Sequence, residues 1–444
     1  MRTFTFKSLF LTVLFVLLGS LAIQAADDGL ITRQITLKLD EAGTLPNKIA
    51  VSRKNLITNL KIVGKINGTD LKFIREMAGR DYYKERTDGK LSILDLSEAK
   101  IVAGGSPYTW NKYGDNEYTS NDKLGDYAFE GCSELTSLTL PSSVTSIDIA
   151  AFYGCWMLTS LTIPSSVTSI GDYAFEGCSG LTSLTIPSSV TSIGWHAFEG
   201  CSGLTSLTLL SGVTSIGYDA FSGCSGLTSL TIPSSVTWIG GDAFRGCSGL
   251  TSLTIPSSVT SIGDWAFYGC SGLTSLTIPS SVTSIGDRAF EGCSGLTSLT
   301  IHSGVTSIGE GVFRGCSGLT SLNIPSGVTS IGDEAFRGCS GLTSIYVYTK
   351  KIPELGSYVF TGCNAKNCTV YVPKGTYDAY KSSKFGYFEK IVEFDASGID
   401  KVTTSTNVKE VSRYSVNGKR LSAPAKGLNI VKYSDGSVKK VVVQ

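Results

Sequence analysis

Cysteine is the residue type in this chain of 444 residues whose spacing most invites a chemical interpretation. Ten cysteines follow one another at intervals of 23 residues, namely Cys132, Cys155, Cys178, Cys201, Cys224, Cys247, Cys270, Cys293, Cys316 and Cys339. If consecutive units stack, neighbouring Cα atoms lie about 5 Å apart, but parallel Cβ vectors give poor disulfide geometry. No C-x-x-C pair occurs, so the sequence has no usual zinc ligand set. We predict a ladder of buried free thiols, with partial pairing of neighbours as the alternative and Cys363 with Cys368 as the best candidate for a disulfide.

Candidates for acid–base or metal chemistry are few. The two histidines, His196 and His302, belong to different 23-residue units, and both are explained as surface substitutions. Aspartates recur once per unit, at Asp172, Asp264, Asp287 and Asp333. Such a row could bind calcium, which prefers several oxygens at close range, but the neighbouring residues differ between units and favour a solvated acidic ridge. With no nucleophile–base pair and no phosphate loop in the sequence, we expect no enzyme activity, no cofactor and no metal site.

Three positions per unit vary while the rest is copied: the two residues before an Ala-Phe pair and the one after it. Because buried positions in a repeat keep their identity, we expect these three to face solvent, and we call them the ridge. Aromatic residues crowd the earlier units, including Tyr127, Tyr153 and His196, and arginines crowd the later ones. Tyr, Trp and Arg most often anchor protein interfaces, although neutral variation at a tolerant edge is the alternative. The residues predicted to bind a ligand are Tyr173, Trp195, Tyr218, Arg245, Trp265, Tyr268, Arg288, Arg314 and Arg337.

A single unit shows which elements must position the ridge. Its apolar residues are Leu181, Leu184, Ile186, Val190, Ile193, Ala197, Phe198 and Cys201. Leu184 to Ile186 alternates as a short strand does, and Pro187 ends the strand because proline cannot donate to a ladder. Val190 to Ile193 is a second extended piece. One such coil cannot cover its own apolar face, so it must stack on its neighbours, and we predict a repeat solenoid with one parallel strand per 23-residue coil.

The unit L-x-x-L-x-I-P-x-x-V-x-x-I-G-x-x-A-F-x-x-C resembles the BspA-like (Treponema pallidum-type) leucine-rich repeat of bacterial and some protist surface proteins. The match covers Leu124 to about Val372, with single departures such as Leu210 and His302 in place of the proline. The resemblance implies a leucine-rich-repeat protein of the cell surface that takes part in adhesion and binding of host proteins. It supplies no catalytic residues to carry over.

The N-terminal region lacks the 23-residue period. Residues 1–25 combine Arg2 and Lys7 with an apolar run and a small-residue cleavage site, which predicts a secretory signal peptide. The apolar run is shorter than the roughly 20 residues of a membrane-spanning helix. Residues 26–123 are predicted to cap the solenoid. Within this cap we expect strands at 58–63 and 91–96, a helix at 70–77 and a surface loop at 104–121.

The solenoid is predicted to occupy residues 124–392. A final strand at 370–373 and a short helix at 377–383 are expected to close the stack. Residues 393–407 are then predicted to form a linker.

Residues 408–444 are predicted to form a separate small β domain with a hairpin turn at Asn417-Gly418. The patterns Y-x-x-x-G-x-x-L from Tyr414 and G-L-x-I from Gly427 resemble the C-terminal sorting domain of the type IX secretion pathway of Bacteroidetes. The resemblance implies passage through the outer membrane. A small β domain that only caps or dimerises is the alternative.

Charge and composition narrow the function. Lys and Arg number 38 against 37 Asp and Glu, so no global basic field attracts nucleic acid or a membrane surface. We predict a secreted or cell-surface adhesin whose ridge binds an extracellular protein, such as a host matrix protein. A carbohydrate-binding module with Trp and Tyr as stacking platforms is the alternative. The outward threonines of the strands could bind ice or sugar, but β-propensity and solubility explain them sufficiently.

Overall fold

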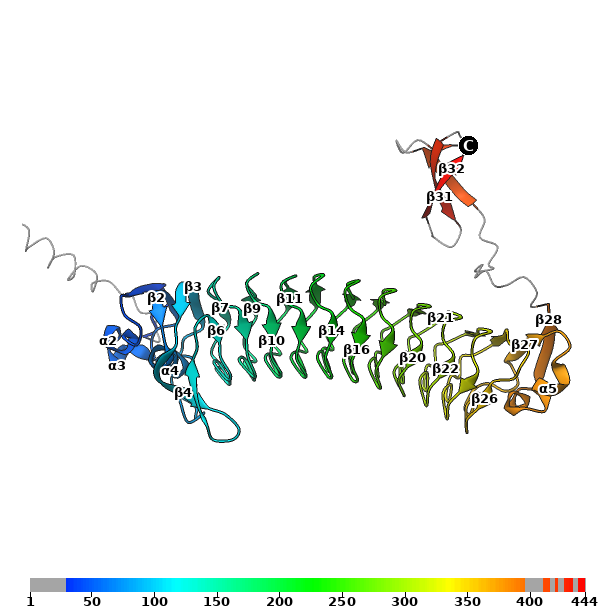
Figure 1. The fold of residues 1–444 in the computed structure, drawn as a ribbon, viewed down its shortest axis with the longest axis horizontal. Coiled ribbons are helices and arrows are strands. Elements are labelled where there is room, and N and C mark those ends of the chain that lie inside the picture. Colours follow the sequence, from blue (N-terminus) through cyan, green and yellow to red (C-terminus); the bar gives the residue numbers. More distant parts are fainter. Residues whose placement is uncertain (1–28, 396–409, 416–419, 422–426, 434–437, 444) are drawn as a thin grey trace, which may run out of the picture. The chain divides into compact units, whose positions relative to one another are not determined.

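The computed structural model describes residues 29–395 without a gap, together with residues 410–415, 420–421, 427–433 and 438–443. The predicted signal peptide, most of the predicted linker and the Asn417-Gly418 turn lie outside the described residues. The chain divides into two compact units, Met1–Phe394 and Asp395–Gln444, which are described separately. The first unit is a solenoid with a cap at each end (Figure 1).

Each coil of the solenoid contributes two short strands, and we number the coils 1 to 11 by their cysteines, from Cys132 to Cys363. Within both rows the strands that pair do so in parallel and in register, so that Leu184 lies opposite Leu207 and Ile193 lies opposite Ile216. The first row consists of β7 (Ser137–Thr139), β9 (Ser160–Thr162), β11 (Ser183–Ile186), β13 (Ser206–Leu209), β15 (Ser229–Thr231), β17 (Ser252–Thr254), β19 (Ser275–Ile278), β21 (Ser298–Ile301), β23 (Ser321–Ile324) and β25 (Ser344–Val347). The second row consists of β6 (Lys123–Leu124), β8 (Ser146–Ile147), β10 (Ser169–Ile170), β12 (Ser192–Ile193), β14 (Ser215–Ile216), β16 (Trp238–Ile239), β18 (Ser261–Ile262), β20 (Ser284–Ile285), β22 (Ser307–Ile308), β24 (Ser330–Ile331) and β26 (Glu354–Leu355). The predicted parallel solenoid is therefore confirmed.

Ladders of identical side chains fill the core. All eight apolar positions of the unit from Leu181 to Cys201 are at most 4% exposed, as the spacing predicts. The phenylalanine rings stack from Phe129 to Phe360 with neighbouring centroids 4.9–6.1 Å apart. Because each coil is covered by the next, stability of the interior depends on neighbouring coils rather than on any single unit.

The cysteines form a ladder of buried free thiols, which confirms that prediction. The Sγ of Cys201 donates to the backbone oxygen of Phe175 in the preceding coil at 3.2 Å, and the same bond recurs along the stack. Burial raises the pKa of Cys201 to about 12, so the thiol stays protonated. Cys363 and Cys368 are also free, and the candidate disulfide between them does not form.

The N-terminal cap extends the first row of strands. Its parallel strands β1 (Ile35–Leu39), β2 (Asn59–Ile66) and β3 (Ile93–Ile101) precede β7 and β9 in one sheet. The two short helices α2 (Leu45–Lys48) and α3 (Val51–Lys54) connect β1 to β2. Helix α4 (Gly68–Met77) starts at a capping box, in which Asn67 and Asp70 each accept a backbone amide of the first turn. The predicted cap strands and helix are confirmed, each with somewhat different bounds.

Buried Arg75 in α4 closes the open end of the repeat. Inside the stack, the amide of Phe129 donates to the carbonyl of Ala151 in the next coil, and later coils repeat this bond. Coil 1 has no preceding coil, and Nη1 of Arg75 donates instead to the carbonyls of Tyr127 and Ala128, at 2.6 and 3.0 Å. The cap thus supplies hydrogen bonds that a preceding coil would otherwise give.

The prediction of a surface loop at 104–121 is wrong. The segment forms an antiparallel hairpin of β4 (Gly104–Trp110) and β5 (Asn116–Thr119) beside α4 (Figure 1). Tyr108 is fully buried, and its hydroxyl donates to the carbonyl of Asp126 at 2.8 Å. This single anchor fixes an otherwise polar hairpin to coil 1.

The C-terminal end has one strand more than predicted. Strand β27 (Thr369–Pro373) and helix α5 (Tyr377–Lys381) are confirmed, but a 3-10 turn (Lys384–Tyr387) and β28 (Lys390–Phe394) follow them. Strand β28 pairs in parallel with β27, so residues 393 and 394 belong to a strand and not to the predicted linker.

The second unit contains a four-stranded antiparallel sheet in the order β30-β29-β31-β32. Its strands are β29 (Glu410–Ser415), β30 (Arg420–Leu421), β31 (Gly427–Tyr433) and β32 (Val438–Val443). The predicted β strands of this region are confirmed.

Candidate functional site

The backbone of the ridge has an unusual and repeated conformation. The second ridge position of every coil is left-handed, with φ between 52° and 59°, and ten of these eleven residues are not glycine. They are Tyr127, Ala150, Tyr173, His196, Asp219, Asp242, Trp265, Arg288, Gly311, Glu334 and Tyr358. Large side chains are uncommon in this region because it favours glycine, and each costs on the order of 1 kcal/mol or more. This strained conformation recurs in every coil except coil 9, where the residue is glycine.

Backbone hydrogen bonds fix the ridge from one coil to the next. The amide of Tyr173 donates to the carbonyl of Trp195 at 2.8 Å, and that of His196 donates to Tyr218 at 2.9 Å. The ridge is therefore a rigid row and not a set of independent loops. The prediction that all its positions face solvent is wrong at Ala150, Ser222, Gly241 and Gly311, which are buried.

The recurring aspartates hold the ridge together and are not simply solvated. The carboxylate of Asp172 accepts the amide of Trp195 in the next coil at 2.8 Å. Asp264 and Asp287 each do the same for the following coil at 2.8 Å, and Asp333 does so at 2.6 Å. Asp264, Asp287 and Asp333 are exposed, in agreement with a solvated acidic ridge, and each carboxylate in addition accepts a backbone amide of the next coil.

Coils 3 to 6 carry an exposed aromatic cluster. Trp195 is 55% exposed and Tyr218 is 46% exposed, and their rings meet edge to face with centroids 5.7 Å apart. Tyr173 is also exposed, and its ring stacks on that of His196 at 4.8 Å. The structure thus brings three predicted site residues, Tyr173, Trp195 and Tyr218, onto neighbouring coils.

Trp238 completes the aromatic cluster, and the sequence analysis missed it. It lies in β16 and not on the ridge, yet its ring packs edge to face on Tyr218 at 5.4 Å. The signal was available, because Trp238 stands where the neighbouring strands β14 and β18 have serine. Trp156 and Met157 were also missed, although the sequence marks them in the same way. They replace the usual Ser-Gly after the cysteine and are 51% and 45% exposed.

The arginines of coils 8 to 10 form ion pairs within the chain, and their role in binding a ligand stays a prediction. Arg288 pairs with Glu291 at 3.4 Å and with Glu310 at 2.5 Å. Arg314 pairs with Glu334 at 2.8 Å, and Arg337 also pairs with Glu334. The side chains of Arg288, Arg314 and Arg337 are 30–43% exposed, so this part of the ridge is a network of ion pairs within the chain.

Cations of the chain itself cover ridge rings on either side of the aromatic cluster. Nζ of Lys84 lies 4.6 Å from the ring centroid of Tyr127 and 4.7 Å from that of Trp110 in the hairpin. Arg245 lies 5.2 Å from the ring centroid of Tyr268 in the next coil and also pairs with Asp242. Of the other predicted residues, Trp265 is 38% exposed and lies in coil 7, where its amide donates to the carbonyl of Asp287 in coil 8.

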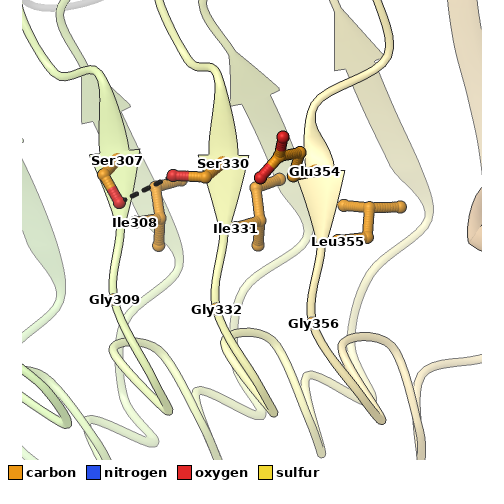
Figure 2. Close-up of a pocket in the computed structure, with 9 residues that line it drawn as sticks. All are labelled: Ser307, Ile308, Gly309, Ser330, Ile331, Gly332, Glu354, Leu355 and Gly356. Carbon is orange, nitrogen blue, oxygen red and sulfur yellow. Dashed lines mark hydrogen bonds between the residues drawn. The ribbon is translucent and has the colours of Figure 1, made fainter.

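A shallow pocket of about 330 Å³ opens on the second row of strands in coils 9 to 11 (Figure 2). It is lined by three successive segments, namely Ser307, Ile308 and Gly309, then Ser330, Ile331 and Gly332, then Glu354, Leu355 and Gly356. The hydroxyl of Ser330 donates to that of Ser307 at 2.9 Å. Ser-Ile-Gly recurs in most coils, so the lining belongs to the repeat itself and only Glu354 and Leu355 distinguish it.

The described part of the chain has neither a metal-binding cluster nor a membrane-spanning helix. No group of three or more His, Cys, Asp or Glu side chains there could hold a metal ion. No helix in that part of the chain is long and apolar enough to cross a membrane.

Several solved structures are similar to this chain. A leucine-rich repeat protein from Bacteroides ovatus is 27% identical, and the alignment covers 70% of this chain and 90% of that one with a TM-score of 0.42. A leucine rich cell surface protein from Faecalibacterium prausnitzii is 29% identical over 65% of this chain and 86% of that one, with a TM-score of 0.34. The pneumococcal vaccine antigen PcpA is 18% identical over 70% and 87%, with a TM-score of 0.38. TM-scores of this size do not support an inference about function.

The sequence itself establishes the family. No curated protein matches the chain. The model of the BspA type leucine rich repeat region, which comprises six copies, matches residues 122–251, 239–367 and 306–423. These matches together cover more than half of the chain and include every coil described above. The chain therefore belongs to the BspA-type leucine-rich repeat proteins.

Proposed function

We propose that the protein is an extracellular binding scaffold whose aromatic cluster contacts a partner protein. The observation that carries this proposal is the exposed aromatic cluster itself, in which Trp195 is 55% and Tyr218 is 46% exposed and their rings meet edge to face. The exposed rings of Trp195 and Tyr218 are of the residue types that most often anchor interfaces.

A location outside the cell is the second part of the proposal. The N-terminal sequence has the features of a signal peptide. We further infer that residues 408–444 act as a sorting domain of the type IX pathway. If so, deletion of these residues leaves the solenoid folded and abolishes surface display, and normal display of the shortened chain contradicts the inference.

Binding is tested with the full chain on arrays of extracellular proteins and of glycans. The test variant combines Trp195→Ser, Tyr218→Ser and Trp265→Ser. The control is Tyr358→Ser, since Tyr358 is left-handed like Trp265 and 67% exposed but lies in coil 11. We expect saturable binding to a protein that the triple variant loses and the control keeps, with circular dichroism unchanged in both. Glycan-only binding replaces the proposal with a carbohydrate module, and equal binding by both variants refutes the placement of the site.

A further inference from the structure

The solenoid has a strong charge asymmetry along its length. Residues 124–244, from coil 1 to the last residue before Arg245, contain no lysine or arginine. The same stretch contains nine acidic residues, namely Asp126, Glu130, Glu134, Asp148, Asp172, Glu176, Glu199, Asp219 and Asp242. Overall the chain is close to neutral, so this acidity is local and is offset elsewhere.

Glu176 and Glu199 occupy the same ridge position on adjacent coils, and no Lys or Arg among the described residues pairs with either carboxylate. Burial and then the neighbouring Glu199 raise the pKa of Glu176. Burial and then the neighbouring Asp242 raise the pKa of Asp219. The single histidine of residues 124–244 is His196, and its Nδ1 lies 2.6 Å from Oε2 of Glu199. The aromatic cluster is thus embedded in negative potential that the described residues of coils 3 to 5 do not neutralise.

At two other places on the ridge, a cation of the chain itself contacts both an aromatic ring and a carboxylate. Lys84 covers the ring of Tyr127 and pairs with Glu130 at 2.8 Å, so one cation satisfies both a ridge ring and a ridge carboxylate. Arg245 does likewise with Tyr268 and Asp242. Between these two places lie Tyr173, Trp195 and Tyr218, over which no cation of the described residues is placed. Their neighbours Glu176 and Glu199 occupy the same third ridge position as Glu130.

We propose that the aromatic cluster of coils 3 to 6 binds a cationic segment of a partner protein, rich in lysine or arginine. The cationic side chains lie against the rings of Tyr173, Trp195 and Tyr218 and pair with Glu176 and Glu199, as Lys84 does with Tyr127 and Glu130. This inference rests on the proposed function and names the chemistry of its partner. Cation–π contacts and ion pairs both contribute, and complementary charge speeds association.

The test measures fluorescence anisotropy of a labelled Lys-Gly repeat peptide with the full chain. A peptide of equal length with glutamate in place of lysine is the first control. One test variant is Glu176→Gln with Glu199→Gln, which removes charge and keeps shape, and the other is Trp195→Ser with Tyr218→Ser. The matched control variants are Glu354→Gln and Tyr358→Ser, which make the same changes in coil 11. We expect saturable binding of the lysine peptide alone, weakened about tenfold by either test variant and by neither control.

The outcomes separate this inference from the proposed function. Equal binding of both peptides, or full binding by Glu176→Gln with Glu199→Gln, overturns the cationic partner. Suppose that a protein found on the arrays loses binding when Trp195 and Tyr218 are replaced, but binds the glutamine variant equally well and is unaffected by added salt. The proposed function then stands and this inference fails. If the lysine peptide binds as expected while array proteins bind elsewhere, the proposed function fails and the cation selectivity of the surface stands.

Discussion

The aromatic half of the ridge, in coils 3 to 6, differs from the arginine half, in coils 8 to 10, although the backbone is the same in both. Tyr173 and Arg288 share a φ of 59° and the same hydrogen bond to the next coil. In the arginine half, Glu310 and Glu334 neutralise the cations, so the side chains bind one another. In the aromatic half, rings are exposed beside Glu176 and Glu199, neither of which pairs with a Lys or Arg among the described residues. The repeat therefore fixes the position of each ridge side chain. The residues of the neighbouring coil determine whether that side chain is paired within the chain or exposed to a ligand.

The first prediction concerns the core beneath the two halves, where the expected effect is largest. Phe198 stacks between rings at 4.9 and 5.1 Å, and Phe290 between rings at 5.2 and 5.7 Å. Both are fully buried. We expect Phe198→Ala and Phe290→Ala each to lower the free energy of unfolding by about 3–5 kcal/mol, measured by urea denaturation. A much smaller loss in one half would show that the halves differ in scaffold and not only in surface.

The second prediction concerns the charges on the two halves. Glu334 pairs with two arginines, whereas Glu176 faces Glu199 and is partly buried. We expect Glu334→Gln to lower the free energy of unfolding by about 0.5–1 kcal/mol at low salt, and less at high salt, because screening weakens ion pairs. Glu176→Gln, the same chemical change, is expected to leave stability unchanged or slightly higher. Equal destabilisation by the two substitutions would contradict the contrast between the halves.

The periodic part of the fold could be predicted from the sequence, because every inward residue, such as Leu184 or Phe198, is repeated at the same place in the next unit. The hairpin at 104–119 could not, since Tyr108 is its main buried anchor and no apolar alternation marks its strands. Trp238 was missed because only ridge positions were compared between units. The pairing of Arg314 with Glu334 was missed because it joins different coils, although residues about one repeat apart must lie side by side in a solenoid.

The smallest expected effect is a dependence on pH that is confined to the aromatic half. Glu176 has a pKa above its ordinary value of 4.5, chiefly because of burial, so the folded state holds this proton more tightly than the unfolded state. Stability from this group is therefore present at low pH and lost as pH rises from about 4.5 through the raised pKa. Arg288, whose pKa is raised first by its hydrogen bond with Glu310, stays charged throughout that window.

Hydrogen exchange measured by mass spectrometry, corrected for the intrinsic exchange rate, resolves the two halves within one sample. We expect amides of coils 3 to 5 to be protected about twofold better at mildly acidic than at neutral pH, with little change in coils 8 to 10. Glu176→Gln should reduce the difference in the aromatic half, because glutamine does not titrate. If protection in coils 3 to 5 instead rises towards neutral pH, Glu176 has a cation partner in solution, and its negative charge is not available to a ligand.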